Sequence, residues 1–170
     1  MEYKQHKQEV EEGFKFLATV DEYVLLGSNA VNLLLKDHLP WEINPTLPLE
    51  IICSQEINPP SGLIVVKTPK DFHPHSPLVI NLIQERTQVN YKEFKLWVPK
   101  PEYLIVLDTL TNPGSPKKDT HIALLMHYLG STLNYELIRN LIKTKSPEEW
   151  ERIKKAIYDF SSNAQASTIE

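Results

Sequence analysis

The stretch EYVLLGSNAVNLLLKDHLP, Glu22–Pro40, decides the fold, because an apolar run stops at Gly27 and a helical pattern starts at once. Tyr23–Leu26 is short, β-prone and uncharged, which is typical of a strand buried on both faces. The leucines and the valine that follow recur at helical spacing, and Ser28 or Asn29 is the expected N-cap. The stretch therefore predicts a strand that turns through glycine directly into the N-terminus of a helix.

Such a turn directs the backbone N–H groups of a helix N-terminus, here with the hydroxyl of Ser28, towards one point. That geometry suits a phosphate group, which the positive end of a helix dipole attracts. The same turn is also a common way to connect a strand to a helix. Gly27 and Ser28 are much less than a full glycine-rich fingerprint, so both interpretations stay open at this point.

The composition is that of an ordinary globular protein, with 170 residues, 41% of them hydrophobic and 24% charged. This length supports one domain with a core, or a compact domain with a small helical appendage. The net charge of -4 excludes general nucleic-acid binding by electrostatics alone. The chain has one cysteine, its N-terminal segment is charged, and no apolar run approaches the ~20 residues of a membrane span. We therefore expect a cytoplasmic protein without a membrane partner.

Periodicity and turn residues predict an α+β order of elements along the chain. We expect helices over 5–20 and 29–38, strands over 23–26, 49–53, 62–67, 77–84 and 91–98, and then helices over 101–110, 117–128 and 134–143 with a last one opening at Ser146. This order predicts an α/β core over residues 1–99 and a C-terminal helical part over 100–162 packed on that core. The polar tail over 163–170 is expected to fray.

Two blocks of sequence resemble the nucleotidyltransferase superfamily, the polymerase-β-like fold. YVLLGSNAVNLLL, residues 23–35, is similar to the opening of prokaryotic AbiEii-like toxins and of the minimal nucleotidyltransferases of toxin–antitoxin pairs. VPKPEYLIVLDTLTNPGSPKKDTHIALLMHYLG, residues 98–130, resembles the family's segment with a Pro-Glu helix start and a later Lys-Asp pair, here Lys118-Asp119. The resemblance implies a mixed sheet flanked by helices, with Gly27, Ser28 and Lys118 binding a nucleotide.

The family's chemistry depends on two acidic residues alternating on one strand and a third acid on a neighbour, which together hold two magnesium ions. By resemblance, Pro48 and Glu50 stand at the positions of the first two acids and Asn81 at the third. Asp108 stands where the family commonly has a lysine. Proline offers no side-chain oxygen and asparagine is neutral, so Glu50 and Asn81 are the remaining candidates for metal binding.

This pattern implies a catalytically degenerate member that acts as a nucleotide-binding or partner-binding module, in a toxin–antitoxin or defence setting by family analogy. The alternative is an active magnesium-dependent enzyme that uses Glu50 to transfer a nucleotide to a protein or RNA hydroxyl. Magnesium and a nucleoside triphosphate are required cofactors only if activity is retained. The sequence leaves open whether the protein is an enzyme, as well as the nucleotide, the acceptor and the partner.

Other chemistry-bearing residues favour structural interpretations. His73 and His75, with Asp71, could bring three ligands to a zinc ion, but the loop also reads as a solvated turn. Cys53 lies in an apolar run, where a buried hydrophobe is favoured over a catalytic thiolate. His121 and His127 are six residues apart, so they lie on different faces of one helix. The three tryptophans are expected to be packing or interface residues.

Overall fold

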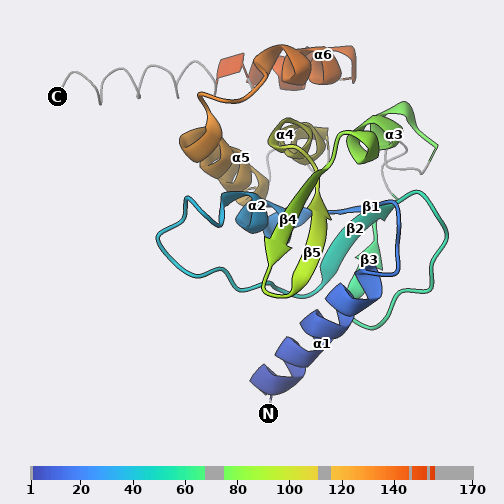
Figure 1. Ribbon diagram of the computed structural model, residues 1–170. Coiled ribbons are helices and arrows are strands. Elements are labelled where there is room, and N and C mark those ends of the chain that lie inside the picture. The colour runs from blue at the N-terminus through green and yellow to red at the C-terminus, as the bar shows by residue number, and fades with distance from the viewer. Residues whose placement is uncertain (1, 68–74, 111–115, 146, 153, 156–170) are drawn as a thin grey trace. The chain divides into compact units, whose positions relative to one another are not determined.

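The fold, seen in a computed structural model, is α+β, as the sequence predicts (Figure 1). The structure describes residues 2–67, 75–110, 116–145, 147–152 and 154–155. The chain divides into two compact units, Met1–Lys100 and Pro101–Glu170. The first contains a mixed three-stranded sheet and a β-hairpin with helices, and the second is helical.

The sheet of the first unit has the strand order β1-β2-β3, with β1 (Tyr23–Leu25), β2 (Leu49–Cys53) and β3 (Leu63–Val65). Strand β1 pairs antiparallel with β2, and β3 pairs parallel with β2. Ile51 is the common point of the register, opposite Leu25 on one side and Val65 on the other. Because side chains alternate along a strand, Leu49 and Ile51 share one face and Glu50 lies on the other.

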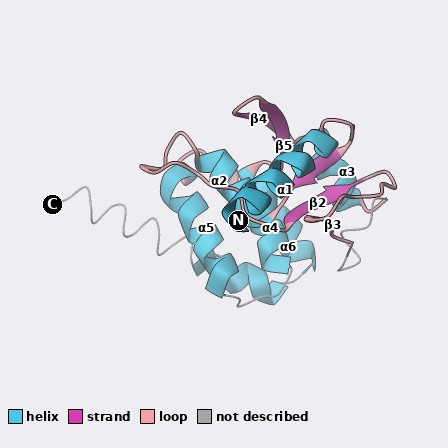
Figure 2. Ribbon diagram, turned by 90° about the horizontal axis from the view of Figure 1, so that it is seen from below, coloured by secondary structure: helices cyan, strands magenta, loops and turns pink. Residues whose placement is uncertain are grey.

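Helix α1 (Glu2–Leu17) packs against the sheet through a glycine. A Cβ atom on Gly13 would lie 2.5 Å from Cδ1 of Leu49, which is fully buried. Figure 2, which looks from below, shows α1 lying across the strands. Phe14 and Leu17 on the same helix are almost completely buried, so α1 contributes to the core of the first unit.

The expected strand over 91–98 is wrong in extent, because the chain forms a hairpin there. Strand β4 (Thr87–Tyr91) pairs antiparallel with β5 (Phe94–Val98), and Lys92 and Glu93 make the turn between them. The pattern failed to show β4 because three of its five residues, Thr87, Gln88 and Asn90, are polar, and because the turn lacks glycine or asparagine, the usual residues of two-residue hairpins. Lys92 adopts φ +51, in the left-handed region.

The expected strand over 77–84 is also wrong, because α3 (Pro77–Gln84) is a helix. The hydroxyl of Ser76 caps it by accepting a hydrogen bond from the Val79 N–H at 3.3 Å, and Pro77 occupies the first turn. Four apolar residues at helical spacing are buried: Leu78, Val79, Leu82 and Ile83. A short apolar run does not separate strand from helix by periodicity, and here the Ser-Pro start is the decisive feature.

A group of three residues connects β1 to β5. The phenol oxygen of Tyr23 accepts a hydrogen bond from the Trp97 main-chain N–H at 3.3 Å. The guanidinium of Arg86 donates to the Tyr23 carbonyl at 3.1 Å and lies 4.0 Å from the Trp97 ring centroid. Burial raises the pKa of Tyr23 and lowers that of Arg86, which agrees with their position inside the unit.

The second unit is built around α4 (Pro101–Leu110), which packs against both α5 (Pro116–Leu129) and α6 (Tyr135–Lys145). The Asn134 side chain caps α6 by accepting a hydrogen bond from the Leu137 N–H at 3.1 Å. Residues 147–152 and 154–155 are also helical. Ser146 and the tail over 163–170 lie outside the described residues, and no helix in the described parts is long and apolar enough to cross a membrane.

We predict that Gly13→Val lowers the free energy of unfolding by about 1–3 kcal/mol, because the added methyl groups overpack the contact with Leu49. Valine has the higher helix propensity, so a loss of stability is evidence for the contact. Urea unfolding measures the change. Glu12→Val, at the exposed neighbouring position, is the control, and equal stability of the two variants would contradict the packing described here.

Candidate functional site

Gly27 forms the junction between strand β1 and helix α2 (Gly27–Leu35), of which it is the first residue. Its φ of +67° lies in the left-handed region, where glycine alone has no steric cost. The expected N-cap at Ser28 or Asn29 is wrong, because Leu26 occupies the cap position and makes no side-chain capping hydrogen bond. The helix therefore begins earlier than the polar residues suggested, directly at the glycine.

Glu50 lies against this turn. The Leu26 N–H donates a hydrogen bond to the Glu50 carbonyl at 2.8 Å, which fixes the two chain segments side by side. A Cβ atom on Gly27 would lie 3.2 Å from Oε2 of Glu50. The half-buried carboxylate is thus beside the N-terminus of α2, where the helix dipole favours negative charge.

Asn29 has a different role from the expected cap. Its side-chain amide donates to the Thr46 carbonyl at 2.9 Å, and its Oδ1 accepts from the Thr46 N–H, also at 2.9 Å. The side chain is buried and pairs with a backbone peptide as a neighbouring strand would. These two bonds attach α2 to the segment that leads into β2 and so support the position of Glu50. Helix α2 also contains Asn32, so the sequence alone does not distinguish Asn29 as the residue with this role.

The other residues expected at the nucleotide site are not gathered in this way. Asn81 is exposed on helix α3 rather than on a strand. Pro48 is exposed and precedes β2. Lys118 belongs to α5 in the second unit, and its side chain is outside the described residues. The structure therefore brings together Gly27 and Glu50, with Ser28 next in the turn.

The carboxylates needed for a two-metal centre are not assembled in the described parts of the chain. Across those residues, no group of three or more His, Cys, Asp and Glu side chains could hold a metal ion. His75 is exposed, and its expected zinc partners Asp71 and His73 lie outside the described residues. The turn offers one carboxylate, that of Glu50, beside a helix N-terminus. The oxygens of this carboxylate can serve as ligands for a single cation.

Sequence analysis did not identify the pairing of Asp108 with His121. Oδ2 of Asp108 on α4 lies 3.5 Å from Nδ1 of His121 on α5, and the two side chains are 11% and 9% exposed. His121 is buried while His127 is exposed, which confirms that they lie on different faces. A contact between two helices leaves no spacing pattern on either one, so the sequence carried no signal of this pair.

Cys53 is a buried free cysteine, as expected. Burial raises the pKa of its thiol, and its Sγ contacts the Gln55 carbonyl at 3.2 Å. A raised pKa reduces the thiolate fraction at neutral pH, which argues against a nucleophilic role.

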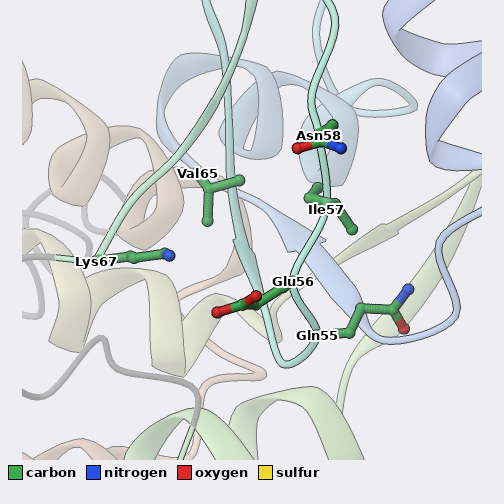
Figure 3. Close-up of a pocket in the computed structure, with 6 residues that line it drawn as sticks. All are labelled: Gln55, Glu56, Ile57, Asn58, Val65 and Lys67. Carbon is green, nitrogen blue, oxygen red and sulfur yellow. The ribbon is translucent and has the colours of Figure 1, made fainter.

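A surface pocket of about 460 Å³ lies between the end of β3 and the segment that leaves β2 (Figure 3). Glu56 and Lys67 extend towards this space, whereas Gln55 points away. Its lining is Gln55, Glu56, Ile57, Asn58, Val65 and Lys67. Val65 pairs with Ile51 and so shares the face opposite to Glu50. This pocket is therefore not the expected nucleotide site.

The tryptophans differ in their surroundings. Trp97 lies under the Arg86 guanidinium, and Trp150 is partly buried. Trp41 is 57% exposed in the segment between α2 and β2. Of the three, Trp97 is thus a packing residue, and the role of Trp41 as an interface residue stays a prediction.

Comparisons with known proteins add no family to this description. No family model, curated protein or solved structure matches the chain.

We predict that Asn29→Ala lowers the free energy of unfolding by about 1–3 kcal/mol, because the two hydrogen bonds between the buried Asn29 side chain and the Thr46 backbone are lost. Asn32→Ala, on the same helix, is the matched control and should cost less. Urea unfolding of both variants checks this, and equal losses would show that the Asn29 bonds contribute nothing specific.

Proposed function

We propose that the protein is a nucleotidyltransferase-like module that binds a nucleoside triphosphate through one divalent cation at Glu50 and has lost two-metal nucleotidyl transfer. The observation that supports this is the position of the Glu50 carboxylate against the Gly27 turn, with Oε2 3.2 Å from a Cβ built on the glycine. The resemblance of residues 23–35 to the opening of that superfamily supplies the class of ligand.

The sign of the charge at the turn determines how a phosphate can bind. A carboxylate and a phosphate oxygen about 4 Å apart repel each other by about 4 kcal/mol at an effective dielectric constant of about 20. A magnesium ion between them removes this repulsion, because both groups are hard oxygen ligands. The module therefore binds the magnesium complex of the nucleotide in preference to the free nucleotide.

The absence of further acids at the expected positions supports binding without transfer. Pro48 has no side-chain oxygen, and Asn81 is a neutral residue exposed on α3. In-line transfer by two metals needs ions on both the attacking and the leaving oxygen. Glu50 alone supplies a ligand for one ion, which suits recognition better than catalysis.

The same resemblance suggests the biological setting. The related groups are prokaryotic toxins and minimal nucleotidyltransferases of toxin–antitoxin pairs, so we propose a protein partner in a toxin–antitoxin or defence system. The single cysteine and the lack of a membrane-spanning helix in the described residues are compatible with a cytoplasmic location. This setting and the class of ligand both rest on family analogy, whereas the position of Glu50 against the Gly27 turn does not.

Isothermal titration with ATP tests the proposal. We expect binding in the presence of magnesium, little binding in its absence, and loss of the magnesium dependence in Glu50→Gln, which removes the charge while keeping the shape. Glu56→Gln is the matched control, because Glu56 is an exposed carboxylate beyond the same strand. It should bind as the unmodified protein does.

An assay with labelled ATP and candidate protein and RNA acceptors separates binding from transfer. We expect no incorporation of label. Incorporation that Glu50→Gln abolishes would instead establish the active enzyme, and equal binding with and without magnesium would refute the role given to Glu50.

A further inference from the structure

A second concave surface of the first unit is lined by three separate segments. It has a volume of about 460 Å³ and lies between helix α1, residues 42–46 and the turn of the β4–β5 hairpin. This size is within the range of small-molecule sites. Neither Gly27, Ser28 nor Glu50 lines this surface, so it is separate from the proposed nucleotide site.

Aromatic side chains contribute much of the pocket's lining. Phe14 is almost fully buried and forms an edge-to-face contact with Tyr91, with ring centroids 6.0 Å apart. Its ring lies 5.3 Å from that of Phe94. Val10 adds a buried aliphatic group from the next turn of α1. Such a wall favours a flat apolar body, which can stack on or lie edge-on to the rings.

Charges of both signs surround this aromatic wall in equal number. Lys7 and Glu11 come from α1, Glu42 from the segment before β2, and Lys92 from the hairpin turn. His6 is engaged otherwise, because its Nε2 lies 3.3 Å from the Pro45 carbonyl and joins residues 42–46 to α1. Two ammonium groups and two carboxylates match a ligand that carries one charge of each sign.

Lys92 gives an independent indication of a site. It is the first residue of a two-residue turn and has φ +51, a position where glycine or asparagine is the usual residue. A lysine in this conformation strains the backbone, and such strain gathers at ligand-binding positions. Its ammonium lies 5.5 Å from the Tyr91 ring centroid, at the side of the pocket.

We propose that this pocket binds a small aromatic zwitterion, a molecule with an aromatic ring, an ammonium group and a carboxylate, which is the chemistry of a free aromatic amino acid. The ligand's ring contacts Tyr91 and Phe94, which are partly exposed and pack on the buried Phe14. The carboxylate pairs with Lys92, and the ammonium pairs with Glu42 or Glu11 across the pocket.

Four probes of the same ring test the proposal by titration calorimetry on the full chain: tryptophan, indole-3-propionate, tryptamine and indole. We expect tryptophan to bind most tightly. Indole-3-propionate lacks the ammonium and tryptamine lacks the carboxylate, so each should bind about tenfold more weakly, the loss of one charge-assisted hydrogen bond. Indole should bind weakest. Equal affinity for indole and tryptophan, or no binding of any probe at millimolar concentration, would overturn the proposal.

Lys92→Gly separates ligand binding from folding. Glycine relieves the positive φ, so the melting temperature without ligand should stay the same or rise, while tryptophan affinity falls about tenfold. Glu93→Gln, the neighbouring turn residue that does not line this pocket, should leave the affinity unchanged. Unchanged affinity in Lys92→Gly, or an equal fall in Glu93→Gln, would refute the assignment of the carboxylate to Lys92.

Discussion

The hydrogen bond from the Leu26 N–H to the Glu50 carbonyl is the constraint on which the first unit's site depends. Strand β1 pairs antiparallel with β2 only up to this point, and the chain must then leave the sheet. Gly27 makes the change of direction possible because its left-handed conformation starts α2 immediately. The Glu50 carboxylate consequently lies against a helix N-terminus.

Asn29 reinforces this geometry from the other side. Its two bonds to the Thr46 backbone fix the segment that enters β2, so the strand carrying Glu50 is attached to α2 at two levels. The Leu26–Glu50 attachment uses backbone groups alone, whereas the Asn29 attachment depends on the asparagine side chain.

The parts predicted from the sequence are those where one local pattern decides the structure. The Tyr23–Leu26 run and the Pro101 helix start correspond to β1 and α4 because burial and end signals agree there. The pattern failed at 77–84, where an apolar run fits either period, and at Lys92, where a turn forms without a turn residue. The proximity of Glu50 to Gly27, the Asn29 bonds to the Thr46 backbone and the Asp108–His121 pair are contacts between segments that are distant in the sequence, which periodicity does not encode.

We propose that the Gly27 turn and Glu50 together bind a nucleotide through one divalent cation. Manganese substitutes for magnesium at oxygen sites and broadens the NMR signals of nearby nuclei, so amide spectra of the protein with ATP and substoichiometric manganese test it directly. We expect selective loss of the Gly27, Ser28 and Glu50 amide signals. Their persistence, with broadening confined to other acidic surfaces such as that around Glu56, would contradict it.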